Sequence, residues 1–316
     1  MRAVKGSLTA SGQPWRHTFS PQNGLMRVDL LAGTLYACAA MTRRAPTILV
    51  FDSGLGGLTV LAEVARARPD AQFVYAADDA GFPYGRLSEP ELVRRTTTVM
   101  EALVRRHRPD LVVVACNTAS TLVLPHLRRA FDLPFVGTVP AIKPAAGLSR
   151  SGLVSVLATP GTVARDYTRD LVHTYAAACQ VTLVGARRLA ELAEAELQGR
   201  PPLDEDVLAE IRPCFVAEGE RRTDVVVLGC THYPLLAARF RQLAPWPVAW
   251  IDSGAAIAGR VRQLLGPVPA EAVGADPAPG LAVFTSGAAL NATLRGALAA
   301  RGLATVAVEP VPMAEA

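Results

Sequence analysis

From residue 47 onward, short apolar runs rich in β-branched residues alternate with longer stretches whose apolar positions recur at helical spacing. Continuous apolar runs are typical of parallel strands buried on both faces, and the longer stretches are typical of amphipathic helices. Helices are predicted at residues 89–107, where Ser88 and Glu91 have capping-box spacing, and at 187–197. Strands are predicted at residues 47–51, 72–76, 111–115, 134–137, 153–158, 181–184, 224–228, 247–251 and 281–285.

This alternation predicts an α/β fold in which helices cover mainly parallel sheets. Residues 112–120 and 225–234 are alike, since each runs from an apolar strand through a cysteine to hydroxyl-bearing residues, and Asp-Ser-Gly occurs at both 52–54 and 252–254. These repeats predict two similar, doubly wound lobes with the active site at the interface between them. The first lobe is predicted to comprise residues 46–138 plus 253–316, and the second residues 139–252.

Residues 1–45 show neither helical nor strand periodicity and are predicted to form a poorly ordered N-terminal extension. Residues 30–41 are apolar, but the charged region before them is too long for a signal peptide and Gly33 interrupts the run. A second interpretation is that the natural chain begins at Met41, directly before the first clear strand.

Composition limits the classes of function. Of 316 residues, 50% are hydrophobic and 19% are charged, which excludes an intrinsically disordered chain. No run of about 20 apolar residues is present, so no membrane partner is expected. The net charge of +4 comes from arginine doublets spread over predicted helices, and only 6% of residues are aromatic, so we expect solvated helix faces and no nucleic-acid partner.

Five cysteines stand at positions 38, 116, 179, 214 and 230, with no pair at metal-knuckle spacing. Their odd number and wide separation favour reduced thiols and a cytoplasmic location over a secreted disulfide framework.

Cys116 and Cys230 each come directly after a predicted strand and before a predicted helix. Ligands bind beyond the carboxyl ends of parallel strands, and a helix N-terminus stabilises negative charge, so we expect both thiols at the site with lowered pKa values. Cys38, Cys179 and Cys214 lack this context and are interpreted as core residues.

Two equivalent thiols suit the inversion of an amino-acid α-carbon, which needs a base on one face and an acid on the other. Each thiol can take either role, so one site can work in both directions. A pyridoxal phosphate enzyme is not expected, because Lys143 is the only lysine in the predicted folded region. No cofactor and no metal are therefore predicted.

Over residues 46–285 the chain resembles glutamate racemase, a cofactor-independent member of the aspartate/glutamate racemase family. Six motifs occur in family order, at residues 51–60 (FDSGLGGLTV), 82–85 (FPYG), 115–119 (ACNTA), 137–142 (GTVPAI), 157–162 (LATPGT) and 228–236 (LGCTHYPLL). The resemblance implies an isomerase that interconverts L- and D-glutamate and supplies D-glutamate for peptidoglycan synthesis. It also implies glutamate as the small-molecule partner and makes a homodimer plausible.

By the same resemblance, Cys230 takes the proton from L-glutamate and Cys116 takes it from D-glutamate. Asp52 is expected beside Cys116 and His232 beside Cys230. The implied substrate contacts come from polar side chains and backbone groups near helix starts, namely Asp52, Ser53, Tyr84, Gly85, Asn117, Thr118, Thr231 and His232.

Plainer interpretations of these residues stay open. Asp52 would also suit a helix N-cap, and His232 a structural histidine. Tyr84 and Gly85 also fit an ordinary turn. The glycine-rich residues 54–57 lack the spacing and lysine of a phosphate loop, so we expect them to give the backbone flexibility beside the substrate.

The chain departs from the family at Gly185, where many members carry a glutamate directly after the strand that we predict at 181–184. Glu191 and Glu194 lie on the following predicted helix and offer substitutes, but glutamates on helices are usually solvated. Which acidic residue, if any, assists Cys230 is left open.

Other functions remain as alternatives. A related racemase or isomerase could act on aspartate, a hydantoin or another small acid, whereas a one-thiol decarboxylase is opposed by the second cysteine. Two lobes could also clamp an amino acid without turnover. Finally, Cys116, Cys230, His232 and Asp52 include zinc-ligand types.

Overall fold

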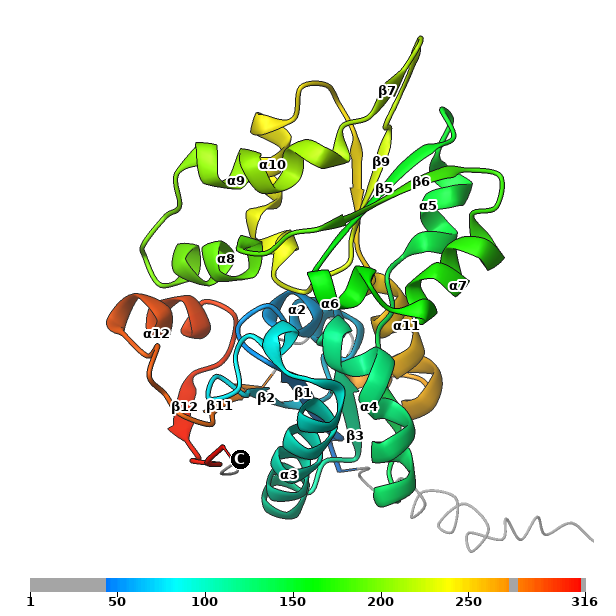
Figure 1. The fold of residues 1–316 in the computed structure, drawn as a ribbon. Coiled ribbons are helices and arrows are strands. Elements are labelled where there is room, and N and C mark those ends of the chain that lie inside the picture. The colour runs from blue at the N-terminus through cyan, green and yellow to red at the C-terminus, as the bar shows by residue number, and fades with distance from the viewer. Residues whose placement is uncertain (1–43, 273–277, 314–316) are drawn as a thin grey trace, which may run out of the picture. The chain divides into compact units, whose positions relative to one another are not determined.

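The computed structural model describes residues 44–272 and 278–313 (Figure 1). The extension predicted at 1–45 lies outside the described residues except for its last two positions, and Cys38 and Met41 lie outside them as well. Ala45–Ala316 group into one compact unit. The lobe boundaries near residues 138 and 252 therefore stay a prediction.

The first sheet has six parallel strands in the order β12-β11-β2-β1-β3-β4 (Figure 1). Its strands come from both ends of the described chain: β1 (Thr47–Asp52), β2 (Gln72–Ala77), β3 (Leu111–Val114), β4 (Phe135–Val136), β11 (Leu281–Phe284) and β12 (Thr305–Val308).

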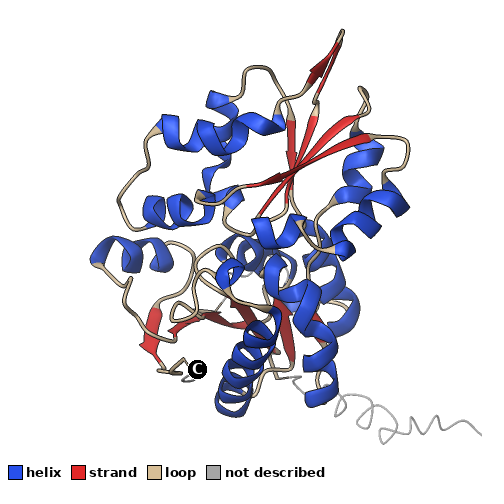
Figure 2. Ribbon diagram, viewed as in Figure 1, coloured by secondary structure: helices blue, strands red, loops and turns tan. Residues whose placement is uncertain are grey.

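Helices cover both faces of this sheet (Figure 2). Successive side chains of β1 point to opposite faces, so Ile48 and Val50 join one core cluster while Leu49 and Phe51 join the other. Residues of α2 (Leu58–Ala67), α11 (Gly254–Leu265) and α12 (Ala292–Ala299) complete the first cluster. Residues of α3 (Glu89–His107) and α4 (Asn117–Ala130) complete the second.

The second sheet has four parallel strands in the order β10-β9-β5-β6. These are β5 (Leu153–Ala158), β6 (Gln180–Gly185), β9 (Val225–Leu228) and β10 (Ala249–Ile251). The helices that accompany it are α5 (Ile142–Leu148), α6 (Pro160–Val163), α7 (Asp166–Tyr175), α8 (Leu189–Leu197), α9 (Asp204–Ile211) and α10 (Ala237–Leu243).

Short elements complete the fold. They are the antiparallel pair β7 (Ala217–Glu218) and β8 (Arg221–Arg222), and the 3-10 turns η1 (Tyr84–Arg86), η2 (Arg212–Cys214), η3 (Tyr233–Leu236) and η4 (Ala270–Ala272).

The predicted α/β class with parallel sheets is confirmed, and each predicted strand is present with bounds that differ by at most two residues at either end. The capping box is also present, since Glu91 accepts the Ser88 backbone N–H at 2.8 Å. The sequence analysis missed β12, an edge strand of four residues that is only partly buried. In the part of the chain that the structure describes, no helix is long and apolar enough to cross a membrane.

Candidate active site

Cys116 lies where it was predicted, directly after β3 and at the N-cap of α4. Its carbonyl accepts the Ser120 N–H at 2.8 Å, which begins the helix. The thiol is buried, with 6% exposure, and its Sγ lies 3.7 Å from the Ser53 Oγ at the end of β1. Parallel strands β1 and β3 are neighbours, and this adjacency brings the two side chains together.

The expected lowering of the Cys116 pKa is wrong. Burial raises the pKa of this thiol to about 12, and the negative charge of Asp52 raises it further in the same direction. The Ala119 N–H in the first turn of α4 opposes this shift, but one helix terminus cannot offset the loss of water around the thiolate. Cys116 therefore holds its proton at neutral pH.

Asp52 is fully buried at the end of β1. Its Oδ2 accepts the Gly57 N–H at 2.9 Å, but the N-cap residue of α2 is Gly57 itself, so the N-cap interpretation of Asp52 is wrong. The Thr231 hydroxyl, from the second sheet, lies 3.3 Å from both carboxylate oxygens. Burial raises the pKa of Asp52, although the neighbouring His232 charge works against the shift.

Cys230 follows β9, but the helix expected after it does not begin there. The chain turns, forms η3 at Tyr233–Leu236, and becomes helical only at Ala237. An α-helix starting at Cys230 would need an N–H four residues later, and Pro234 has none. The Tyr233 N–H donates to the Cys230 carbonyl at 3.2 Å instead.

His232 is the ionisable partner of Cys230, as predicted. Its Nδ1 lies 3.7 Å from the Cys230 Sγ, and its Nε2 lies 2.9 Å from the Oε1 of Glu194. Burial alone would lower the pKa of His232, but hydrogen bonds to Cys230 and Glu194 raise it well above its ordinary value. The Gly56 N–H donates to Nε2 at 3.2 Å, a hydrogen bond that Nε2 accepts only while it carries no proton and that therefore competes with donation from Nε2 to Glu194. The raised pKa favours the imidazolium, in which Nε2 donates to Glu194.

Of the two glutamates that the sequence offered as substitutes, Glu194 is the one that contacts His232. It lies on α8 with only 8% exposure, and its Oε1 also accepts the Leu55 N–H at 2.8 Å. Glu191 points elsewhere and pairs with Arg86 at the surface. The sequence signal that could have identified Glu194 is its place in the helical pattern, because it shares the buried face of α8 with Leu189 and Ala193.

Gly185, where the resemblance implies a glutamate, is a tight position for any side chain. A Cβ there would stand 3.1 Å from the Val163 Cγ2 and 3.2 Å from the Pro160 Cα. The glutamate that contacts His232 here is Glu194, on helix α8, which follows this strand.

The glycine-rich loop after β1 allows close packing. A Cβ on Gly54 would lie 2.0 Å from the Glu194 Oε1, and one on Gly56 would lie 2.5 Å from the His232 Nδ1. Neither glycine has a positive φ, so the expected role in backbone flexibility gives way to close approach. The Phe82 ring also packs against His232, with ring centroids 5.3 Å apart.

The groups around the two thiols face one another across the two sheets. The Thr59 hydroxyl donates to the Thr231 carbonyl at 3.2 Å, beside the contact between Thr231 and Asp52. Burial is the main cause of the raised Cys116 pKa, and the charge of Cys230 contributes to it in the same direction.

Residues 51–261 match the family model described as Asp/Glu/Hydantoin racemase. The chain belongs to this racemase family. It is 55% identical over 249 residues to the glutamate racemase of Agrobacterium fabrum, covering 78% of this chain and 90% of that protein. It is also 58% identical over 219 residues to the glutamate racemase of Brucella ovis, covering 69% and 79% respectively.

Solved racemase structures agree with this membership. The fold matches Escherichia coli glutamate racemase, crystallised with L-glutamate and the activator UDP-MurNAc-ala, with a TM-score of 0.76 and 42% identity. The match covers 84% of this chain and 99% of that one. A Bacillus anthracis glutamate racemase isoform matches with a TM-score of 0.69 and 25% identity, covering 85% and 98%.

The remaining residues predicted to bind substrate differ in whether their polar side-chain atoms already have hydrogen-bond partners within the protein. Asn117 is buried, and its Oδ1 has no hydrogen-bond partner among the described residues. The Thr118 hydroxyl lies 3.2 Å from the hydroxyl of Thr159, the N-cap residue of α6. The Tyr84 hydroxyl donates to Asp78, so a substrate contact at this turn would use the backbone of Tyr84 and Gly85.

The zinc interpretation is not supported by the donor geometry. Over residues 44–272 and 278–313, no group of three His, Cys, Asp or Glu side chains is arranged to hold a metal ion. The carboxylates and imidazole near the thiols are instead engaged in hydrogen bonds with protein groups.

Proposed function

We propose that this chain racemises glutamate, with Cys116 and Cys230 as the acid and base and with no cofactor. The observation that carries the proposal is the pair of buried thiols at the ends of strands in two facing sheets, each beside its own ionisable partner. The high identity to named glutamate racemases supports glutamate as the substrate.

In the L to D direction, Cys230 removes the α-proton as a thiolate. The protonated His232 compensates the thiolate charge from 3.7 Å, and Glu194 keeps His232 protonated. Cys116 then donates its proton to the opposite face of the planar carbanion. Its raised pKa suits this step, because the thiol keeps its proton until a strongly basic carbon needs it.

In the D to L direction the roles exchange, so Cys116 must first lose its proton. The ammonium group of the substrate brings a positive charge into the buried site and stabilises the Cys116 thiolate. Asp52, whose charge acts on Cys116 and whose own pKa is raised by burial, takes up that proton as a carboxylate and returns it.

Substrate binding uses the polar groups left around the thiols. The unpartnered Oδ1 of Asn117 can accept a hydrogen bond from the substrate ammonium. The N-terminus of α4 and the hydroxyls of Ser53, Thr118 and Thr231 can donate to its carboxylates. Supply of D-glutamate for peptidoglycan synthesis, a cytoplasmic location and a homodimer belong to this proposal as predictions.

The test is α-hydrogen exchange in deuterium oxide, followed by proton NMR and chiral chromatography, on both glutamate enantiomers and on aspartate. We expect the chelator-dialysed enzyme to form deuterated product from either glutamate enantiomer and to prefer glutamate to aspartate. Cys116→Ala and Cys230→Ala should each lose racemisation by about a thousand-fold or more.

Residual exchange distinguishes the two faces. Cys116→Ala should exchange only L-glutamate, and Cys230→Ala only D-glutamate, because each keeps one thiol. The matched control is Cys179→Ala, at a half-buried cysteine outside the site, which should racemise normally. Normal turnover by either active-site variant would refute the mechanism, and faster turnover of aspartate would refute the substrate.

A further inference from the structure

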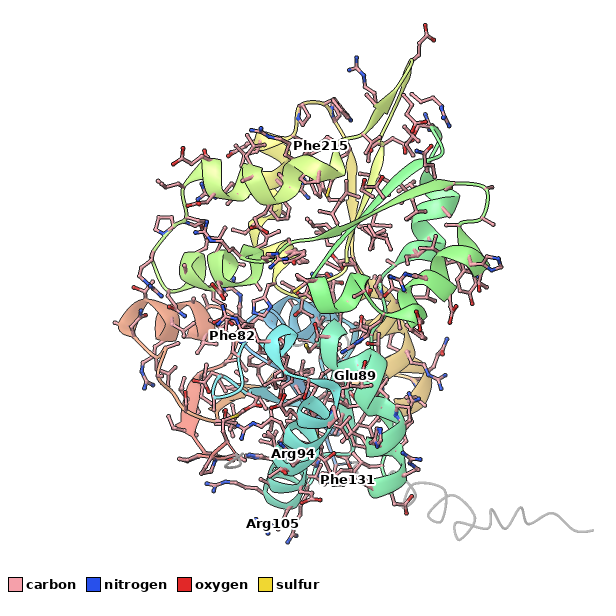
Figure 3. All side chains as sticks on the ribbon, viewed as in Figure 1. Phe82, Glu89, Arg94, Arg105, Phe131 and Phe215 are labelled. Atoms are coloured by element: carbon pink, nitrogen blue, oxygen red, sulfur yellow. The ribbon has the colours of Figure 1, made fainter. Side chains whose placement is uncertain are left out.

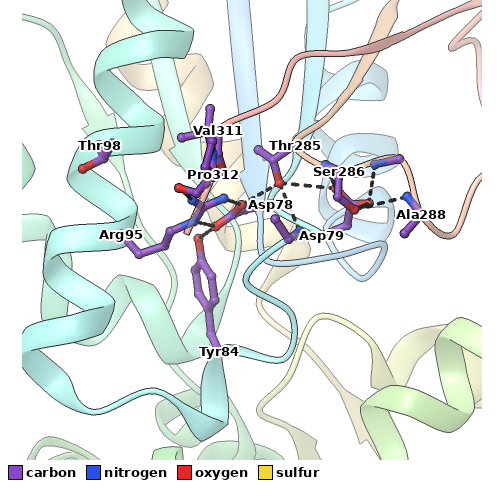
Figure 4. Close-up of polar contacts among 12 residues, drawn as sticks. Asp78, Asp79, Tyr84, Arg95, Thr98, Thr285, Ser286, Ala288, Val311 and Pro312 are labelled. Atoms are coloured by element: carbon purple, nitrogen blue, oxygen red, sulfur yellow. Dashed lines mark hydrogen bonds and ion pairs between the residues drawn. The ribbon is translucent and has the colours of Figure 1, made fainter. Parts of the chain in front are cut away.

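A buried ion pair lies behind the Tyr84–Gly85 turn. Arg95 on α3 and Asp78 directly after β2 have side-chain exposures of 4% and 0%. The Arg95 Nε donates to the Asp78 Oδ2 at 2.8 Å, and a second guanidinium nitrogen donates to Oδ1 (Figure 4). This two-point geometry fixes both side chains.

The third nitrogen of the Arg95 guanidinium binds the C-terminal segment, which we define as residues 309–313. It donates to the carbonyl oxygens of Val311 at 2.6 Å and Pro312 at 2.7 Å (Figure 4). Hence one arginine joins helix α3, the end of β2 and the segment that follows β12.

Apart from the Arg95 contact, the C-terminal segment is held mainly at its first residue, Glu309, whose N–H donates to the Phe284 carbonyl at 2.8 Å. Glu309 pairs with the Arg106 Nε at 2.9 Å and lies 3.1 Å from the His107 Nε2. The Val311 side chain packs against the core cluster beneath α3. Grooves of about 380 and 310 Å³ separate other parts of the segment from α3. The Arg95 contact is thus a principal attachment of the segment.

Asp78 connects Arg95 to the Tyr84–Gly85 turn. Its Oδ2 also accepts the Tyr84 hydroxyl at 2.6 Å, and its Oδ1 accepts the Thr285 hydroxyl at 2.7 Å (Figure 4). The Tyr84 ring is 2% exposed and packs near Phe51, with centroids 6.4 Å apart. The orientation of Asp78 therefore determines where Tyr84, and with it Gly85, is held.

We propose that the C-terminal segment is a positioning element of the active site, acting through Arg95 and Asp78 on the Tyr84–Gly85 turn. The inference rests on the proposed function, in which this turn contacts the substrate. Without the two carbonyl acceptors, Arg95 turns towards water to satisfy its N–H groups, because a buried unpaired donor is costly. Asp78 then loses its fixed orientation, and the turn loses its anchor.

The effect should fall on substrate affinity, because Arg95 and Asp78 bond to one another and to the Tyr84 turn, which contacts the substrate in the proposed function. A chain that stops at Pro310 and the variant Tyr84→Phe should each raise KM for both glutamate enantiomers roughly five-fold, with kcat within two-fold of the parent. Arg95→Met should raise KM at least as much. The matched control is Arg94→Met, at the adjacent, exposed arginine of α3, which should keep both constants (Figure 3).

Hydrogen exchange measured by mass spectrometry tests the same link without any assay of activity. In the chain that stops at Pro310, amides of residues 82–87 should exchange at least several-fold faster, while those of α8 keep their protection. Tyr84→Phe leaves the segment in place and should accelerate the same amides alone.

The outcomes separate two failures. If the full chain does not racemise glutamate, the proposed function fails, and faster exchange at 82–87 still supports the mechanical link. If the shortened chain keeps the parent KM and the parent exchange at 82–87, the positioning role is overturned, even where the melting temperature falls.

Discussion

The Nε2 atom of His232 lies 2.9 Å from the Oε1 atom of Glu194, and neither side chain is more than one-tenth exposed. This contact joins a turn of the second sheet to helix α8, 38 residues apart in the chain. A buried imidazole is ordinarily driven towards its neutral form, so the carboxylate decides its charge. Because His232 adjoins Cys230, Glu194 sets the charge available beside that thiol.

Glu194→Gln should lower kcat/KM by roughly ten- to hundred-fold, the loss expected for one charge-assisted hydrogen bond. Glutamine removes the negative charge that raises the His232 pKa, so this pKa falls and His232 loses its proton at a lower pH. The alkaline limb of the pH–rate profile should therefore move to lower pH. The measurement is kcat/KM for L-glutamate across the pH range.

Glu191→Gln is the matched control, because Glu191 lies on the same helix and pairs with Arg86 at the surface. It should leave the profile in place. An unshifted alkaline limb in Glu194→Gln would show that Glu194 does not control the charge of His232. Since the two enantiomers have equal free energies, kcat/KM is the same in both directions for every variant, which checks each data set internally.

Gly56→Ala should disrupt the active site by steric overlap. The added Cβ would stand 2.5 Å from the Thr231 Oγ1 and 2.6 Å from the His232 backbone nitrogen, which is too close for any real contact. We expect the free energy of unfolding to fall by about 1–3 kcal/mol and racemisation to be largely lost. Urea denaturation and steady-state kinetics measure the two effects.

The control for this substitution is Gly147→Ala in α5, where a Cβ meets nothing within 4 Å. Alanine favours the helix by roughly 0.5–1 kcal/mol, so that variant should be at least as stable as the parent. Equal behaviour of the two glycine variants would contradict the close-packing role of Gly56.

Cys116→Ser should reduce the alkaline sensitivity of stability. The Cys116 pKa is about 12 in the folded chain and about 8.5 in an unfolded one. Below about pH 8.5 both states hold the proton and the contribution of this thiol is fully present. As the pH rises towards 12, the unfolded state loses its proton first, so stability falls by up to about 1.4 kcal/mol per pH unit.

Serine does not titrate in this range, so the drop in unfolding free energy between pH 7.5 and 10 should be smaller in Cys116→Ser than in the parent. Urea denaturation at the two pH values gives the comparison, with both proteins sharing every other titrating group. A parallel decline in the two proteins would rule out a strongly raised Cys116 pKa.

Arg165, the N-cap residue of α7, connects that helix to α4 next to Cys116. One of its guanidinium nitrogens donates to both the Thr118 carbonyl and the Thr121 hydroxyl of α4. Arg165→Met leaves these acceptors without their donor, and we expect a loss of about 1–3 kcal/mol in unfolding free energy together with a raised KM. Arg169→Met, at an exposed arginine paired only with Asp166 three residues away, should stay within about 0.5 kcal/mol of the parent.

The sequence predicted much of the fold because its signals are local. The apolar runs of β1, β3, β5 and β9 are short, continuous and bounded by polar residues, and the parallel arrangement follows from the helices between them. The same runs placed Cys116 and Cys230 at strand ends, where a parallel sheet presents its ligands. Family motifs then supplied glutamate as the expected substrate.

By itself, the sequence determined the α/β class and the two thiols at strand ends, since each depends on neighbours a few residues apart, while the expectation that His232 lies beside Cys230 came from the family resemblance. Only the tertiary structure decided that Glu194 completes the site, that burial raises the Cys116 pKa, and that Arg95 ties the C-terminal segment to the Tyr84 turn. Desolvation and long-range hydrogen bonds depend on which distant segments meet, and no local pattern of residues records that.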